Sequence, residues 1–335
     1  SGGQDNEANG YFSSVGGGEN NQAGYYATVS GGELNVALGY HSVVGGGGQN
    51  GAFAYMSSVA GGQYNTATAG HAFVGGGWGN TASGFVSTVA GGDWNLASSY
   101  ATAIGGGLSN YAGGYASTIG GGVGNTATSS GAGVFGGLRN AASGFVSTIA
   151  GGHDNRATGP AATIGGGSNN LAVGVYGSVS GGSNNLVGYS ASIGGGSDNT
   201  ALGAYVTIAG GARNTANNNY GSVGGGEANA AGYYATVSGG ELNTALGYHS
   251  VVGGGRQNDA NAYSATVAGG EYNTASSNHA FIGGGWGNTA SGYLSSVSGG
   301  DFNWANSYAS AINGGYWNYA GGYASSIGGG SWNAA

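Results

Sequence analysis

The 335-residue chain has no cysteine, no lysine, one proline and few charged residues of either sign. The absence of cysteine excludes disulfides and thiol chemistry, and it is consistent with an extracellular protein. Four basic residues, all arginine, stand against 12 acidic residues, so the net charge is −8. We expect no nucleic-acid partner, because phosphate binding needs clustered positive charge. We also expect no membrane insertion, because no apolar run approaches the roughly 18 residues of a membrane span.

Glycine is the residue that the chain has in abundance, with 83 copies, whereas charged residues make up only 5%. This composition argues against an ordinary globular core. It also differs from disordered segments, which combine low hydrophobicity with high net charge. Here 39% of the residues are hydrophobic, and they recur at fixed intervals. The spacing indicates an internal repeat.

The repeat has the frame V/I-x-G-G-x-x-N-x-A and returns every 14 or 15 residues from Val15 onwards. Its aliphatic residue, its two glycines and its asparagine are present in every copy, and its alanine fails once, at Val187. A frame kept this strictly indicates stacked coils in which each position forms a column. We expect structural ladders represented by Val29, Val134 and Ile208 in the aliphatic column and by Asn35, Asn140 and Asn214 in the asparagine column.

Strands fit this repeat better than helices, because a Gly-Gly pair in every unit weakens a helix by roughly 1 kcal/mol per glycine. The two-residue period of a strand puts Ala27 and Val29 on one face. It also puts Asn35 and Ala37 on one face of a second strand. The glycines allow a tight corner, and the asparagines can bond backbone and each other from coil to coil. We predict an all-β, parallel β-solenoid of about 22 coils with a narrow interior of small side chains.

A longer duplication overlies the short repeat, because residues 17–122 return as residues 225–330. The residue after the aliphatic position also tends to alternate between glycine and serine or alanine. A turn of about 30 residues is therefore an alternative to the 14- to 15-residue coil. We expect one continuous repeat domain over residues 1–335. Since the sequence begins and ends within a repeat, we expect flanking segments or ends that stack on neighbours.

The pattern T-V-S-G-G-x-x-N-x-A-x-G, from Thr28 to Gly39, resembles the head repeats of trimeric autotransporter adhesins, which also occur in phage tail fibres. The resemblance implies a left-handed β-roll, three chains side by side and a role in surface attachment. Two columns depart from the family pattern, with glycine in place of isoleucine and asparagine in place of alanine. Independently, the column after the aliphatic residue is small except at Phe135 and Asn313, which permits close approach of another chain. We expect self-association, as a homotrimer or as an end-to-end or lateral fibre.

Reactive side chains do not recur together. The five histidines lie in different coils, and none stands with a carboxylate and a hydroxyl in a catalytic arrangement. We interpret them as surface residues that stand in for aromatics. Acidic residues follow the Gly-Gly corner, but their period is wrong for calcium-binding nonapeptide repeats. We therefore expect no enzyme activity, no cofactor and no metal.

Aromatic residues form two outward columns. The first recurs eleven positions after the aliphatic residue and contains Tyr40, Tyr55, Phe85, Tyr100, Tyr115, Phe145, Tyr248, Tyr263, Tyr293, Tyr308 and Tyr323. The second lies at the Gly-Gly corner and supplies the candidate ligand-binding residues Tyr64, Trp78, Trp94, Trp286, Phe302, Trp317 and Trp332. Exposed rings beside amides and carboxylates suit stacking on sugar rings of surface glycans. The alternative is that the rings cover glycine-rich backbone or pack between chains.

These observations predict a structural or adhesive fibre, or an adhesin head, that is extracellular and sits on a cell or virion surface. The alternative is an ice-binding β-solenoid. One column holds Thr66, Thr81, Thr126, Thr200, Thr215, Thr244, Thr274 and Thr289. That column is interrupted by Leu96, Tyr111, Arg156 and Trp304, so a flat threonine face is not secured.

Overall fold

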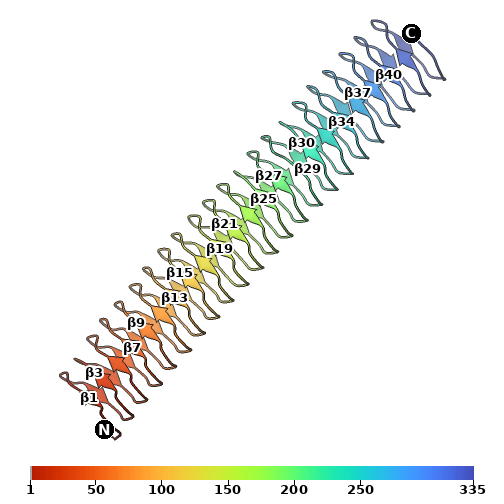
Figure 1. Ribbon diagram of the computed structural model, residues 1–335. Helices are drawn as coiled ribbons and strands as arrows, with labels where there is room; N and C mark the ends of the chain where they lie inside the picture. Colours follow the sequence, from red (N-terminus) through yellow and green to blue (C-terminus); the bar gives the residue numbers. More distant parts are fainter. Residues whose placement is uncertain (1) are drawn as a thin grey trace. The chain divides into compact units, whose positions relative to one another are not determined.

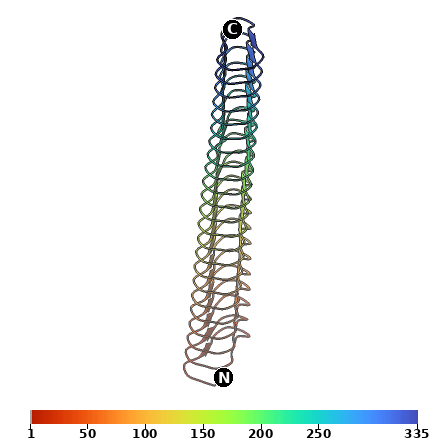
Figure 2. The ribbon, with the colours of Figure 1, turned by 90° about the vertical axis from the view of Figure 1, so that its right-hand side faces the viewer.

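The computed structural model describes residues 2–335 as two units, residues 2–169 and residues 170–335. In each unit the chain winds as a parallel β-solenoid with about 15 residues per turn, and the two units together hold about 21 turns. Figures 1 and 2 show the turns of each unit lying one over the next. The described residues form strands and turns but no helix. The expectations of one continuous domain, left-handedness and a trimer stay predictions.

The register of the strands decides between the two coil lengths. Val29 pairs with Val44 and Val36 pairs with Gly51, so partners on neighbouring strands lie 15 residues apart. The 14- to 15-residue coil is therefore confirmed, and the alternative of a 30-residue turn is wrong. The alternation that suggested it reflects packing between neighbouring turns. A Cβ on Gly45 would clash with the carbonyl oxygen of Ala60 in the next coil.

Each coil contributes to three parallel ladders. The valine ladder consists of two-residue strands that end on the aliphatic residue of the repeat, such as β4 (Thr28–Val29). The alanine ladder consists of two-residue strands that end on the alanine, such as β5 (Val36–Ala37). The corner ladder consists of single-residue bridges four positions after the aliphatic residue, such as Glu33 to Gly48. The sequence predicted the first two ladders and missed the third.

In residues 2–169 the strands of the two ladders alternate along the chain. The valine ladder contains β2 (Ser14–Val15), β4 (Thr28–Val29), β6 (Val43–Val44), β8 (Ser58–Val59), β10 (Phe73–Val74), β12 (Thr88–Val89), β14 (Ala103–Ile104), β16 (Thr118–Ile119), β18 (Gly133–Val134), β20 (Thr148–Ile149) and β22 (Thr163–Ile164). The alanine ladder contains β1 (Glu7–Ala8), β3 (Gln22–Ala23), β5 (Val36–Ala37), β7 (Gly51–Ala52), β9 (Thr66–Ala67), β11 (Thr81–Ala82), β13 (Leu96–Ala97), β15 (Tyr111–Ala112), β17 (Thr126–Ala127), β19 (Ala141–Ala142) and β21 (Arg156–Ala157).

Residues 170–335 repeat this arrangement. The valine ladder contains β24 (Ser178–Val179), β26 (Ser192–Ile193), β28 (Thr207–Ile208), β29 (Ser222–Val223), β31 (Thr236–Val237), β33 (Val251–Val252), β35 (Thr266–Val267), β37 (Phe281–Ile282), β39 (Ser296–Val297), β41 (Ala311–Ile312) and β43 (Ser326–Ile327). The alanine ladder contains β23 (Leu171–Ala172), β25 (Leu186–Val187), β27 (Thr200–Ala201), β30 (Ala230–Ala231), β32 (Thr244–Ala245), β34 (Asp259–Ala260), β36 (Thr274–Ala275), β38 (Thr289–Ala290), β40 (Trp304–Ala305) and β42 (Tyr319–Ala320). Between β27 and β30 the ladder continues through single bridges at Thr215.

The interior of each coil is narrow and filled by small side chains, as predicted. Ala27, Val29, Asn35 and Ala37 are all fully buried. One valine or isoleucine per coil contributes roughly 1.5–3 kcal/mol on burial, so apolar area alone gives each coil little stability. The coils therefore depend strongly on backbone hydrogen bonds to their neighbours.

The corners use left-handed backbone, at the Gly-Gly pair as expected and also at positions that are not glycine, which the sequence did not predict. The second glycine of the pair has positive φ, +92° at Gly32, and a Cβ there would clash with the carbonyl oxygen of Gly47. Two further positions per coil are also left-handed without being glycine, represented by Leu34 and His41 at φ +58°. Such a conformation costs roughly 1–2 kcal/mol per residue. A hydrogen bond offsets the cost, because the Leu34 N–H donates to Glu19 of the preceding coil at 2.9 Å.

Candidate functional site

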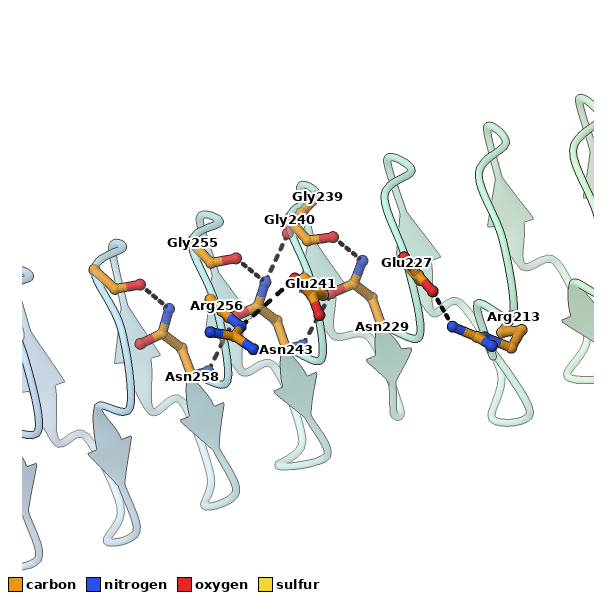
Figure 3. Close-up of polar contacts among 11 residues, drawn as sticks. Arg213, Glu227, Asn229, Gly239, Gly240, Glu241, Asn243, Gly255, Arg256 and Asn258 are labelled. Carbon is orange, nitrogen blue, oxygen red and sulfur yellow. Dashed lines mark hydrogen bonds and ion pairs between the residues drawn. The ribbon is translucent and has the colours of Figure 1, made fainter.

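The asparagine column forms a buried hydrogen-bonded ladder, drawn in Figure 3 for part of residues 170–335. The Nδ2 of Asn243 donates to the carbonyl oxygens of Gly239 at 2.9 Å and of Gly255 at 2.8 Å, the latter in the next coil. Its Oδ1 accepts the backbone N–H of Asn258 at 3.0 Å. Each asparagine thus ties its own Gly-Gly corner to the coil above it.

The asparagines singled out from the sequence make the same contacts. Asn35, Asn140 and Asn214 are each fully buried. Each donates to a glycine carbonyl in its own coil and to another in the next, and each accepts a backbone N–H from the next asparagine. Because the side-chain amides already make hydrogen bonds within the solenoid, they have no free donor or acceptor for a ligand. The column is a structural device.

Exposed rings on the surface of residues 2–169 form a continuous pile, which we call the main ring stack. Neighbouring members contact one another from coil to coil, and they are Phe12, Tyr26, Tyr40, Tyr55, His71, Phe85, Tyr100 and Tyr115. Tyr100 and Tyr115 are stacked almost parallel, with ring centroids 5.1 Å apart. His71 bridges Tyr55 and Phe85 in the coil where the aromatic position is Gly70. The contact geometry agrees with the interpretation of this histidine as a replacement for an aromatic residue.

Residues 170–335 carry a main ring stack of their own. Its members are Tyr189, Tyr205, Tyr220, Tyr234, Tyr248, Tyr263, His279, Tyr293, Tyr308 and Tyr323. A side-chain hydrogen bond with Tyr189 raises the pKa of Tyr205, and desolvation raises the pKa of Tyr234. These phenols therefore stay neutral at neutral pH. The stack of the first unit extends from Phe12 to Tyr115, and that of the second unit extends from Tyr189 to Tyr323.

The corner ring stack is the second set, and it differs between the units. In residues 2–169 it contains only Tyr64, Trp78 and Trp94. In residues 170–335 it contains Tyr272, Trp286, Phe302, Tyr316, Trp317 and Trp332. The structure therefore brings the candidate ligand-binding residues together as two separate groups. Tyr272 and Tyr316 were missed from the sequence, although they occupy the same two corner positions.

A third set of rings lies on the strand faces and covers glycine. A Cβ on Gly51 would run into the ring of Phe53, and a Cβ on Gly113 would run into the ring of Tyr111. The alternative that aromatic rings cover glycine backbone therefore describes these residues. It also applies in part to the ring stacks, because some members, such as Trp94, lie over a glycine as well as packing on neighbouring rings.

A groove opens beside the corner ring stack of residues 170–335, with a volume of about 320 Å³. One side is formed by the stacked rings of Phe302, Trp317 and Trp332. The other side is formed by Trp304 and Tyr319, which point outward from β40 and β42. Trp304 and Tyr319 were not among the predicted ligand-binding residues. Their spacing of two from Phe302 and Trp317 along the strand was the available signal.

Three arginines at the corners are each paired with an acidic side chain. Arg139 contacts Asp154 through two nitrogens at 2.9 Å, and Asp154 also contacts His153 at 3.0 Å. In the other unit Arg213 pairs with Glu227, and Arg256 lies 3.5 Å from Glu241 (Figure 3). Within residues 2–335 no group of three His, Asp or Glu side chains could hold a metal ion. No helix in that range is long and apolar enough to cross a membrane.

No protein-family model matches the chain, and no curated protein matches it. The resemblance to adhesin head repeats is therefore an expectation from the sequence pattern alone. What the chain does must be argued from its own surface.

Proposed function

We propose that this chain is a non-catalytic, multivalent scaffold that acts outside the cell, on a cell or virion surface. It attaches that surface to another or to neighbouring fibres through the main ring stacks. The observation that carries the proposal is their continuity, since rings as exposed as Tyr40 and Tyr55 contact one another from coil to coil. Exposed apolar surface of this extent generally marks a contact site. Linked weak contacts raise overall binding strength by orders of magnitude over a single contact.

Association between copies of the chain is part of the proposal. A coil that buries one valine gains little from its own core, whereas a second copy would cover exposed rings and the small-residue column after the aliphatic residue. The net charge of −8 over 335 residues opposes such contact only weakly, because charged side chains are sparse. A homotrimer, or a lateral or end-to-end fibre, is the form that we propose.

The test measures attachment and self-association with the same protein. Beads coated with the chain are passed over surfaces coated either with the chain or with a neutral polysaccharide film, and retention under flow is counted. Sedimentation velocity over a hundredfold range of protein concentration reports the oligomeric state. We expect retention, and we expect Tyr55→Ser with Tyr100→Ser to reduce it several-fold. The proposal is refuted if beads coated with the wild-type chain are washed from both surfaces and the chain also stays monomeric at every concentration.

Ice binding is the second candidate, and the alanine ladder is the observation that favours it. Thr66 pairs with Thr81 and Thr274 pairs with Thr289, so adjacent coils present threonine at the strand spacing. The next partners are Leu96 and Trp304, which interrupt the threonine column in both units. Thermal hysteresis distinguishes the two candidates, because ice binding requires it and attachment does not.

A further inference from the structure

The duplicated sequence provides an internal comparison for the groove beside the corner ring stack. The two blocks share their inward columns, and Trp94 corresponds to Phe302 at an offset of 208 residues. At the same offset Trp317 replaces Ser109 and Trp332 replaces Gly124. The fold therefore accepts serine and glycine at these positions, so it does not need the two tryptophans. Large exposed rings that the fold does not need are candidates for binding.

Backbone conformation gives these positions no preference for tryptophan. Trp317 has φ +55° and Trp332 has φ +60°, in the left-handed region that side chains other than glycine disfavour. Gly124 occupies the same column in the first block at φ +63° without that penalty. Ser109 has φ +56°, so the left-handed conformation belongs to the corner column as a whole, and what distinguishes Trp317 and Trp332 is the size of their rings.

The groove has the size and chemistry for one kind of ligand. Its volume of about 320 Å³ is at the small end of ligand sites, which suits one or two sugar rings. No charged residue lines it, and the polar groups that it offers a ligand are the Tyr319 hydroxyl and indole N–H groups. The Tyr319 hydroxyl accepts a hydrogen bond from Asn306 at 2.8 Å, which leaves its own proton available to donate.

Other occupants fit less well. A stable protein partner needs roughly 1,000 Å² or more of buried surface, far beyond a groove on a few coils. An anionic polymer needs unpaired cations, whereas Arg213 and Arg256 in this unit are already paired with glutamates. A pyranose whose linkages and hydroxyls are all equatorial presents only C–H groups on its two faces. Those C–H groups carry the partial positive charge that the negative faces of aromatic rings attract.

We propose that the groove formed by Phe302, Trp304, Trp317, Tyr319 and Trp332 binds a neutral, β-linked pyranose chain. This inference rests on the proposed attachment function and names the ligand class for one of its surfaces. The two piled rings, Trp317 and Trp332, lie with centroids 5.3 Å apart and planes within 5°. They give the groove one straight wall, while Trp304 and Tyr319 give the opposite wall. The corresponding corner of the first block has Ser109 and Gly124 in place of this wall.

The experiment titrates the full chain with cellohexaose and measures heat and tryptophan fluorescence. We expect one site per chain. The double variant Trp317→Ser with Trp332→Gly should lose at least tenfold in affinity, while Trp78→Leu, in a corner column that already accepts Leu108, should bind as the wild type does. Because both replacements restore residues of the first block, unchanged far-ultraviolet circular dichroism is expected. Equal affinity of the double variant and the wild type, or no binding by the wild type, would overturn the inference.

A gain-of-site variant tests the same inference in the other unit. Leu96→Trp, Ser109→Trp and Gly124→Trp together copy the groove beside Trp94 and Tyr111, and we expect the stoichiometry to rise from one to two. A Cβ on Gly124 meets nothing closer than Arg139 at 3.5 Å, so the position has room. An unchanged stoichiometry in this folded variant would count against the groove. The two proposals can fail separately. If chain-coated beads are retained on chain-coated surfaces but the chain does not bind cellohexaose, the groove proposal is wrong and the attachment function stands.

Discussion

Replacing Asn243 by alanine should weaken the solenoid at one corner and through it the whole of residues 170–335. Alanine removes both donated bonds, to the carbonyl oxygens of Gly239 and Gly255, and the bond accepted from the Asn258 N–H. Three backbone groups lose these partners, and Asn258 is fully buried. The effect reaches two coils, because Gly255 and Asn258 belong to the coil after Asn243 (Figure 3).

The magnitude follows from how well water can replace each partner. A buried group left without a hydrogen bond costs roughly 1–3 kcal/mol. The Asn258 N–H is out of reach of water, whereas the two glycine carbonyls lie at a partly exposed corner and recover part of their loss. We therefore expect the free energy of unfolding to fall by about 3 kcal/mol for residues 170–335. A domain of this size loses about 2–4 °C in melting temperature per kcal/mol, so the shift should be roughly 6–12 °C.

Two matched variants make the measurement decisive. Asn243→Asp keeps the shape but places an oxygen against two carbonyl oxygens, so it should destabilise at least as much as alanine. Asn333→Ala removes an exposed asparagine that donates only to Gly329 and to Asn318, and it should cost less than 1 kcal/mol. Guanidinium unfolding followed by circular dichroism gives all three values. If Asn243→Ala and Asn333→Ala have the same free energy of unfolding, the asparagine ladder does not stabilise the corners and the reasoning is wrong.

Four further substitutions test single positions. Gly62→Ala should destabilise by several kcal/mol, because its φ is +85° and its Cβ would meet backbone of the next coil. Gly61→Ala should be nearly neutral in the same unfolding assay, since nothing lies within 4 Å of its Cβ. Burial raises the pKa of Asp259, so the folded chain binds that proton more tightly; Asp259→Asn should melt higher than the wild type at pH 7, and the difference should vanish below about pH 4. Arg256→Ala should change the free energy of unfolding by less than about 1 kcal/mol, because the pair with Glu241 is exposed and 3.5 Å long.

The inward columns were predictable because packing allows them almost no choice. Val29, Asn35 and Ala37 face an interior that has room for small side chains only. The same residue types therefore recur at the same positions of every coil, and the repeat can be recognised in the sequence. The two-residue period of the strands and the unbroken repeat frame then favoured a parallel solenoid with the correct coil length. The 30-residue alternative arose from Gly45 and its equivalents. A glycine required by the neighbouring turn looks, in sequence, the same as one required by a longer period.

The corner ladder and the left-handed positions could not be predicted in the same way. Leu34 and His41 adopt positive φ although neither is glycine or asparagine, because hydrogen bonds to the preceding coil compensate for the strain. Nothing in residue type signals such compensation. The outward aromatic columns recur along the sequence but are interrupted, so the sequence alone did not show which rings contact one another. The groove was found only in part because Trp304 and Tyr319 lie in a column of mixed residue types, in which their aromatic rings did not stand out as a pattern.

Comparison of the two blocks within the chain separates what the fold requires from what a surface adds. Inward residues are the same in kind in both copies, whereas the corner residue changes from Ser109 to Trp317 without altering the coil, since both have φ near +55°. A solenoid transmits an outward change to its neighbours only through side-chain contact, because the backbone of each coil is fixed by the coils above and below. Copying a block therefore supplies a second, independently variable surface on an unchanged core. Any difference in binding between residues 2–169 and residues 170–335 must then originate in the outward columns, and the corner is where the two sets of aromatic rings differ most.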